Sequence, residues 1–415
     1  MNINEKWQAL EAEVTRRGGD GPEFVKAMKD HNAIYTDKLY LWLASLYDKE
    51  IGGFYYSITG RDNEPFRPDI ESTYQAVGLM LGSGLLARSE DLPLPMREQI
   101  IKFCQSLISP EDGYIYHPQW DYSDPEWRHK DSRLGRDLNW ANQLSNWFNF
   151  KYPYPTAYER LKASAEGGEK KNVGESAPHL ASAKALIEYL DSYDWDEDAY
   201  FSGNNVVSQV NQIISAGLGD VMIDFLNKKQ NPETGLWGSK GGYIGINALL
   251  KISSAYRAAK AEFPSAEKAM QAAIDCITSD EYCGTICFQY NALFSVSNLL
   301  GILKNLGTKQ SLESADKAQT LLLKNAPAVI RATTEKVKLF ARDDGGFSYQ
   351  QNRSAAFSQG APVAIPMTLE GDVNASAIAS TGTTRNLYEA FGLVDFKVPF
   401  YDEEDSKKLL NAIKY

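Results

Sequence analysis

A short acidic loop that contains glycine and an aromatic residue recurs along this chain of 415 residues. The clearest copy is DDGGFSY at residues 343–349, which precedes a stretch rich in small residues at 372–391. Related loops lie at residues 47–55, 110–116, 196–201, 231–237 and 280–284. A loop that recurs in this way indicates an architecture built from one repeated supersecondary unit.

Each loop lies between two stretches with helical periodicity, which predicts a pair of helices per repeat. The predicted outer helices cover residues 34–46, 96–108, 180–190, 220–229, 266–278 and 312–340, the last with a break at Pro327. The predicted inner helices cover residues 69–86, 137–148, 206–218, 243–259, 291–306 and 372–391. Six outer helices that alternate with six inner helices predict an all-α fold, an (α/α)6 toroid or barrel.

The repeat also predicts the domain organisation. We expect an N-terminal helical extension at residues 1–30, interrupted at Gly18-Gly19, then the toroid at 31–394 and a charged tail at 395–415. A long insertion at 117–179 interrupts the repeat, and long loops inside compact domains are usually functional or disordered. The first half of the insertion is rich in aromatic residues, which favours a functional loop.

Composition restricts the partners and the location. The formal net charge is −11, and binding to nucleic acid or to an anionic membrane needs basic patches. The N-terminus is polar, and no run of eighteen apolar residues occurs, so we expect neither a signal peptide nor a membrane span. Four cysteines do not make a disulfide framework. We therefore expect a cytoplasmic protein without nucleic-acid or membrane partners, and its oligomeric state stays open.

The predicted inner helices begin with many polar side chains, which a toroid would gather at one mouth. Helix N-capping by Asp and Asn explains some of them. Amides, carboxylates and aromatic rings together also suit a polyhydroxylated ligand. The predicted carbohydrate-binding residues are Trp120, Trp140, Asn142, Tyr74, Glu71, Asn211, Trp237, Tyr243, Asn247, Tyr290, Asn291, Tyr349, Arg353 and Asn374.

One candidate mechanism is β-elimination from a uronate, in which a base removes a proton while a cation neutralises the carboxylate. His117 or Tyr116 is the predicted base. The predicted neutralising groups are Arg133 or Arg136, with Asn139 or Asn142. The competing interpretation is a surface loop whose charges are simply solvated.

A second candidate mechanism is hydrolysis by paired carboxylates. The candidates lie at the starts of predicted inner helices and are Asp69, Glu71, Asp137, Glu370 and Asp372, with Asp69, Asp137 and Asp372 favoured. Each could equally serve as an N-cap. The sequence CGTIC at 283–287 has no histidine after it, which indicates buried thiols rather than a metal site. We expect no metal and no cofactor.

Two motifs resemble the terpenoid cyclase and protein prenyltransferase superfamily of α/α toroids. They are DGGF at 344–347 with GDVNASA at 371–377, and DIESTY at 69–74 looks like another copy. The resemblance implies the toroid. The catalytic residues depart from the family, because class II cyclases use an Asp-x-Asp-Asp acid where this chain has DVNA at 372–375. Prenyltransferases hold zinc with Asp, Cys and His, and no histidine follows His179.

Polysaccharide lyases and several glycoside hydrolases are also α/α toroids, and this chain looks similar to them in its predicted architecture and polar mouth. We therefore expect a carbohydrate-active enzyme that cleaves an oligosaccharide or polysaccharide, favoured as a lyase on a uronate-containing glycan. The alternatives are a glycoside hydrolase, a relative of isoprenoid cyclases and prenyltransferases, and a non-catalytic glycan-binding toroid.

Overall fold

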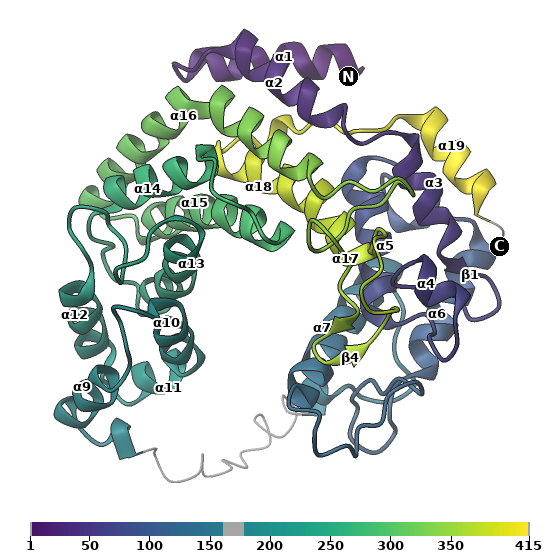
Figure 1. Cartoon of the computed structure of the whole chain (residues 1–415), viewed down its shortest axis with the longest axis horizontal. Coiled ribbons are helices and arrows are strands. Elements are labelled where there is room, and N and C mark those ends of the chain that lie inside the picture. Colours follow the sequence, from purple (N-terminus) through teal and green to yellow (C-terminus); the bar gives the residue numbers. More distant parts are fainter. Residues whose placement is uncertain (1, 161–177, 414–415) are drawn as a thin grey trace. The chain divides into compact units, whose positions relative to one another are not determined.

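The computed structural model describes residues 2–160 and 178–413, and nearly all of its regular structure is helical (Figure 1). This confirms the all-α prediction. The chain divides into two compact units, and each is assembled from three segments. Unit 1 comprises Met1–Asn32, Asn172–Val337 and Thr383–Val398, and unit 2 comprises Ala33–Lys171, Lys338–Gly382 and Pro399–Tyr415.

Unit 1 contains two rows of helices. Helices α10, α13, α15 and α18 pack side by side in that order, and α9, α12, α14 and α16 lie along one side of them (Figure 1). The elements are α1 (Ile3–Arg16), α2 (Gly21–Asn32), η2 (Pro178–Leu180), α9 (Ala183–Asp191), α10 (Ala199–Ser208), α11 (Val210–Ser215), α12 (Gly219–Lys229), α13 (Gly242–Ala259), α14 (Ala266–Thr278), α15 (Ile286–Leu306), α16 (Lys309–Lys338), α18 (Thr383–Ala390) and η4 (Val394–Phe396). Helices that alternate along the chain therefore form separate rows, as the predicted pairs require.

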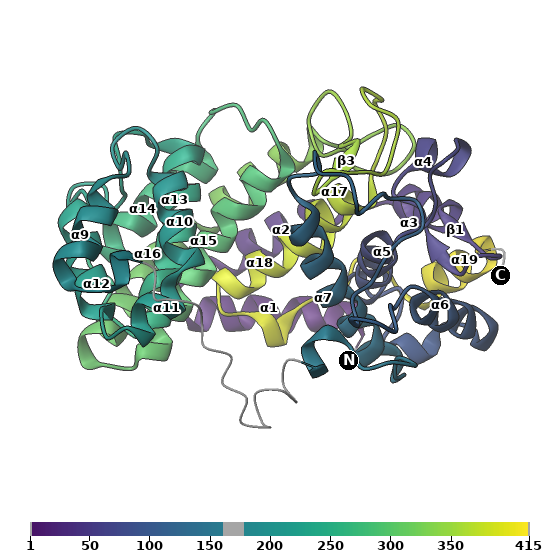
Figure 2. The same ribbon diagram turned by 90° about the horizontal axis from the view of Figure 1, so that it is seen from below.

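Unit 2 is centred on α5, which packs between α7 and α17, while α6 packs against α7 and α19 against α3. The elements are α3 (Asp37–Ser45), β1 (Tyr47–Asp48), β2 (Gly53–Phe54), α4 (Ile58–Asp62), α5 (Ile70–Ser83), η1 (Ser89–Asp91), α6 (Leu94–Ser106), α7 (Lys130–Phe148), β3 (Phe357–Ser358), β4 (Ala361–Pro362), α17 (Val373–Ala377), η3 (Ile378–Gly382) and α19 (Glu403–Ala412). Strands β1 and β2 pair antiparallel, as do β3 and β4. The loop that carries β3 projects beyond the ends of α5 and α7 (Figure 2).

The recurring loop adopts one geometry at four of its predicted positions. In each copy, the residues on either side of the glycine turn come together as a short antiparallel bridge. The bridges pair Tyr47 with Phe54, Ile108 with Ile115, Gln230 with Trp237 and Ala341 with Phe347. The sequence repeat thus corresponds to a structural repeat that occurs in both units.

The glycine of this loop is required by its backbone and by its neighbours. Gly345 has a φ of 102°, and a Cβ there would lie 2.4 Å from the carbonyl oxygen of Lys38 in α3. Gly52 has a φ of 85°, and its Cβ would lie 2.4 Å from the carbonyl oxygen of Gln99 in α6. A side chain is excluded at both positions. Gly113 and Gly235 have the same combination of positive φ and close backbone contact.

Four predicted helices differ from those observed. Helix α16 continues through Pro327 without the predicted break, because its buried stripe runs on through Leu323, Ala326 and Ile330 and packing outweighs the lost hydrogen bond. Helix α7 begins at Lys130 rather than at residue 137. The region predicted as one helix at 206–218 contains the end of α10 and the short helix α11, and the helix at 372–391 contains the π-helical turn η3.

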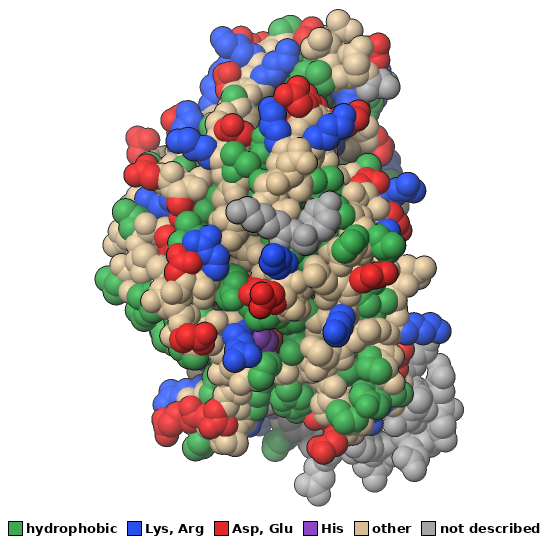
Figure 3. All heavy atoms as spheres, turned by 90° about the vertical axis from the view of Figure 1, so that its right-hand side faces the viewer, with side chains coloured by type: hydrophobic (Ala, Val, Ile, Leu, Met, Phe, Trp, Pro, Cys, Tyr) green, Lys and Arg blue, Asp and Glu red, His purple; other side chains and the backbone are tan. Residues whose placement is uncertain are grey.

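Two features of the structure relate to the predicted location of the protein, namely its charged surface and its most apolar helix. Figure 3 shows acidic and basic side chains interspersed over one face of the molecule. Within residues 2–160 and 178–413, one helix, α15, is long enough and apolar enough to cross a membrane, judged by length and composition. It contacts α13, α14 and α18, and 61% of its most apolar window is buried, as in a core helix of unit 1.

Candidate functional site

Arg133 lies at the centre of a buried ionic cluster in unit 2. Its Nε donates to Asp137 Oδ2 at 2.9 Å, and its Nη1 donates to Glu71 Oε2 at 3.0 Å. Its Nη2 donates to Asp69 Oδ1 at 3.2 Å. The Arg133 side chain is 0% exposed. Arg136 adds a second guanidinium, whose Nε donates to Glu71 Oε1 at 2.7 Å.

Helix spacing explains why these side chains meet. Arg133 and Asp137 are four residues apart in α7, so they lie on one face of that helix. Asp69 is the N-cap of α5 and Glu71 lies in its first turn. Because α5 packs against α7, the two acidic residues face the arginine. The cluster is thus a direct consequence of two neighbouring helix starts.

The cluster contains three carboxyl groups and two guanidiniums. Burial raises the pKa of Asp137 to about 7, although Arg133 opposes that rise. Burial would also raise the pKa of Glu71, but Arg133 and Arg136 outweigh it and hold that pKa below its ordinary value. The charges of the cluster balance when Asp137 carries a proton.

The cluster also holds two loops of unit 2 in place. Ser358, in β3, donates its hydroxyl to Glu71 Oε2 at 2.8 Å. The Arg133 guanidinium lies 4.3 Å from the ring centroid of Trp120, within cation–π range. The charged groups beneath the surface therefore position both the β3–β4 hairpin and the loop that contains Trp120.

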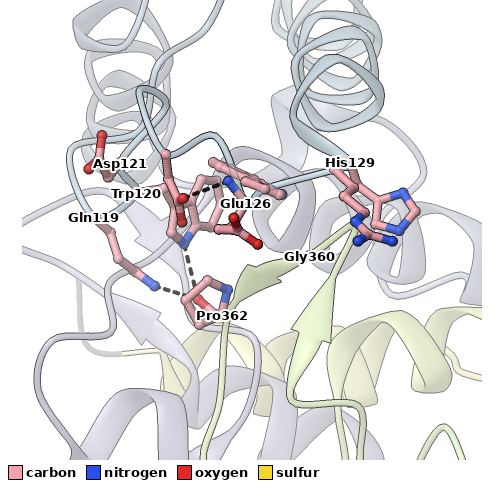
Figure 4. Close-up of a pocket in the computed structure, with 10 residues that line it drawn as sticks. Gln119, Trp120, Asp121, Glu126, His129, Gly360 and Pro362 are labelled. Carbon is pink, nitrogen blue, oxygen red and sulfur yellow. Dashed lines mark hydrogen bonds between the residues drawn. The ribbon is translucent and has the colours of Figure 1, made fainter.

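A pocket of about 430 Å³ lies on the surface where these two loops meet. It is lined by Gln119, Trp120, Asp121, Asp124, Glu126, Trp127, Arg128, His129, Gly360 and Pro362. Trp120 Nε1 and Gln119 Nε2 donate to the Pro362 carbonyl oxygen at 3.0 and 2.7 Å (Figure 4). Trp127 Nε1 donates to the Gln359 carbonyl oxygen at 2.9 Å. These bonds fix two indole rings against the hairpin.

The rim of the pocket is charged. Figure 4 shows the Glu126 carboxylate directed toward the middle of the pocket and His129 on the opposite side. Ser123 donates two hydrogen bonds to Asp121, at 2.6 and 2.9 Å, and they hold the pKa of Asp121 below its ordinary value. With Asp121, Asp124 and Glu126 against Arg128, the lining carries an excess of negative charge.

The structure places the predicted bases in hydrogen bonds of the fold itself. His117 is buried, and its Nε2 donates to the Pro68 carbonyl oxygen at 2.7 Å while its Nδ1 accepts from the Gln119 N–H at 3.2 Å. Burial lowers the pKa of His117. Tyr116 donates to Asp112 at 2.7 Å, and partial burial raises its pKa to about 12. Both groups hold their own loop together in this conformation.

The predicted carboxylates of the hydrolytic mechanism are buried as well. Asp69 Oδ1 accepts from the Ser72 N–H at 3.0 Å and caps α5. Asp372 Oδ1 accepts from the Ala375 N–H at 2.7 Å and caps α17. Burial raises the pKa of Asp372 to about 7. Asp69 and Asp372 thus act as helix N-caps, the role that the sequence analysis gave as the alternative to catalysis. Asp137 belongs to the ionic cluster.

Several predicted binding residues of unit 2 do come together on α5, α7 and α17. Tyr74 stacks on Trp140 with ring centroids 4.2 Å apart. Gln75 Nε2 donates to Asn374 Oδ1 at 2.9 Å. The remaining predicted residues of this unit lie half-buried on α7 or in the loop before β3, namely Asn139, Asn142, Tyr349 and Arg353.

Two of the aromatic residues predicted for binding belong to the core of unit 1. Trp237 is fully buried, and its Nε1 donates to the Leu226 carbonyl oxygen at 2.9 Å. Tyr243 is buried, donates to Gln289 Oε1 at 3.0 Å and accepts from Lys336 Nζ at 2.8 Å. Neither ring faces solvent, so both stabilise the unit rather than contact a ligand.

Of the other predicted residues of unit 1, Asn247 is buried, while Tyr290 and Asn291 are partly exposed. Asn291 Nδ2 donates to Asn247 Oδ1 at 2.9 Å, which joins α15 to α13. The Tyr290 hydroxyl accepts from Arg385 Nη2 at 3.2 Å. Asn211 is exposed on α11. Asn247, Asn291 and Tyr290 thus link neighbouring helices of unit 1.

Among the predicted site residues, Trp120 alone lines the pocket in the described part of the chain. The sequence DPEWRH at 124–129 contributes most of the other residues that line the pocket. It concentrates an indole, charges of both signs and an imidazole within six residues. That density was the available signal. In the same described residues, no group of three or more His, Cys, Asp or Glu side chains could hold a metal ion.

No protein-family model, curated protein sequence or solved structure that was compared with the chain matches it.

Proposed function

We propose that the pocket binds a sugar ring and that the protein is a carbohydrate-active enzyme that cleaves a glycosidic bond there. The supporting observation is the pocket itself, in which Trp120 and Trp127 are fixed beside carboxylate, guanidinium and imidazole groups. Indole faces suit the C–H surfaces of a sugar, and the polar side chains suit its hydroxyl groups. A pocket of about 430 Å³ also lies within the size range of small-ligand sites.

The charge of the rim favours hydrolysis of a neutral glycan. Asp121, Asp124 and Glu126 would repel a uronate, and like-charge juxtaposition disfavours a partner. Glu126 is directed into the pocket (Figure 4), so it is the group placed to exchange a proton with a bound glycoside. His129 lies across from it and supplies a second proton-transfer group.

Elimination from a uronate is the second candidate, and a different observation favours it. Arg128 and His129 are adjacent in the sequence and both line the pocket, and together they could neutralise a carboxylate and remove the adjacent proton. This version of the mechanism replaces His117 and Tyr116, whose polar atoms are engaged within the fold.

The (α/α)6 toroid is likewise our proposal for the complete fold. The two rows of helices in unit 1 and the shared geometry of four loops support it. An isoprenoid-converting relative is disfavoured because the pocket has a charged lining rather than an apolar one. We also propose a cytoplasmic location, because four cysteines do not make a disulfide framework.

The experiment is a screen of neutral and uronate-containing oligosaccharides that follows both new reducing ends and the ultraviolet absorbance of an unsaturated product. We expect reducing ends without absorbance. Glu126→Gln should then lower kcat by about 100-fold or more, because loss of a general acid or base costs about that much. The control is Glu50→Gln, an exposed glutamate in the β1–β2 turn of the same unit.

Each outcome separates the alternatives. Reducing ends with absorbance, abolished by His129→Ala and not by Glu126→Gln, would replace hydrolysis by elimination. Binding without turnover, measured by calorimetry, would make the protein a glycan-binding module. Absence of both binding and turnover across the screen would refute a carbohydrate function.

A further inference from the structure

The β3–β4 hairpin carries an exposed aromatic side chain beside the pocket. Phe357 in β3 pairs directly with Pro362 in β4 in antiparallel register. Residues directly opposite each other in such a pair place their side chains on the same face of the sheet. Pro362 lines the pocket, so Phe357 shares the face that borders it.

The alternation of side chains along β3 supports this placement. Ser358, the next residue, is 8% exposed and donates to the buried Glu71 at 2.8 Å. Successive residues in a strand point to opposite faces, so Phe357 points away from the ionic cluster. Its side chain is 57% exposed, so most of the ring is open to a ligand.

The backbone under this ring is held firmly. The Pro362 carbonyl accepts hydrogen bonds from Trp120 and Gln119, and Ser358 is bonded to the ionic cluster. At the turn, Gly360 has a φ of 77°, and a Cβ there would lie 2.7 Å from Trp127 Nε1. The exposed ring is therefore carried on a preorganised support, which lowers the entropic cost of binding a ligand against it.

We propose that Phe357 is an aromatic platform for a second sugar residue, next to the one bound in the pocket that Trp120 and Trp127 line. The inference rests on the proposed carbohydrate function and narrows its substrate class. It makes the substrate an oligosaccharide of at least two sugar residues, and it makes Phe357 a residue that determines specificity for chain length. The occupant is a sugar because the phenyl ring of Phe357 extends a pocket with an aromatic and polar lining rather than an enclosed apolar groove.

The test compares Phe357→Ala and Phe357→Tyr with the wild-type protein on a monosaccharide and on oligosaccharides of increasing length. Calorimetry gives Kd, and initial rates give kcat/KM. We expect Phe357→Ala to weaken oligosaccharide binding by about 3- to 10-fold, the effect of one aromatic contact. Monosaccharide binding should be unchanged, and Phe357→Tyr should retain wild-type affinity. Leu369→Ala, at another exposed apolar side chain of the same loop, is the matched control.

The outcomes distinguish the inference from the function on which it rests. If the wild-type protein binds oligosaccharides and Phe357→Ala binds every chain length as the wild type does, the second platform is refuted while the proposed function stands. An equal loss for the monosaccharide and the oligosaccharides would also refute it, because the ring would then act on the pocket as a whole. A wild-type protein that binds no glycan refutes both proposals.

Discussion

Replacement of Arg133 by methionine tests whether the ionic cluster organises unit 2. Methionine keeps most of the apolar volume of the side chain and removes the guanidinium. The substitution withdraws the donor that Asp69, Glu71 and Asp137 share, at distances of 2.9 to 3.2 Å. Arg136 would remain as a partner for Glu71 alone.

The magnitude follows from burial. Removal of one partner from a buried ion pair costs about 3–5 kcal/mol, because the remaining charge is left uncompensated. Since Arg133 is 0% exposed and serves three carboxyl groups, we expect Arg133→Met to lower the free energy of unfolding of unit 2 by at least about 3 kcal/mol. The loss should shrink toward acidic pH, as the carboxyl groups become protonated and neutral.

Urea unfolding measured by tryptophan fluorescence at about pH 8 provides the assay. Most of the tryptophans report on unit 2, namely Trp42, Trp120, Trp127, Trp140 and Trp147. Arg61→Met is the matched control, because Arg61 pairs with Asp62 at the surface and should cost no more than about 1 kcal/mol. If Arg133→Met costs no more than this control, the cluster does not hold unit 2 together and the reasoning is wrong.

Three further predictions concern pH and the repeated loop. The pKa of Asp137 is raised to about 7, so the folded state keeps a proton that the unfolded chain releases. This contribution to stability is lost as pH rises from about 4 to about 7. Asp137→Asn should remove this dependence of the free energy of unfolding on pH, as measured by urea unfolding. Burial lowers the pKa of His31 to about 3, so the stability of unit 1 should fall as pH falls below about 6.5. In His31→Gln the stability of unit 1, followed by circular dichroism, should depend less on pH in this range. Gly345→Ala should destabilise unit 2 by about 2 kcal/mol or more in a thermal melt, because the added Cβ would overlap the Lys38 carbonyl. Gly135→Ala is the control, since a Cβ at that position in α7 meets nothing within 4 Å, and it should be neutral or stabilising in the same melt.

The parts of the fold that could be predicted are those set by local chemistry. Gly52 and Gly345 identified the repeated loop because a positive φ and a close backbone contact leave no choice of residue. Asp69 and Asp372 identified helix starts because their carboxylates accept N–H groups of the first turn. Pro327 misled the prediction, since a proline interrupts the hydrogen bonds of a helix but packing around α16 keeps it continuous.

The pocket could not be predicted in the same way, because it depends on contacts between distant segments. Trp120 and Trp127 are placed by carbonyl groups of Pro362 and Gln359, more than 200 residues further along the chain. No periodicity or motif relates those positions. The aromatic residues of the insertion predicted a functional loop, but they did not indicate which other loop would meet it.

The same reasoning explains why the most conspicuous polar residues are not at the surface of the pocket. Arg133, Glu71 and Asp137 lie where the starts of α5 and α7 meet, and there their charges pair with one another and hold the loops above them. A buried group that makes several strong bonds cannot also exchange protons with a ligand without losing them. The proposed function therefore assigns proton transfer to exposed side chains of the loops, Glu126 and His129, while the paired charges beneath keep those loops in position.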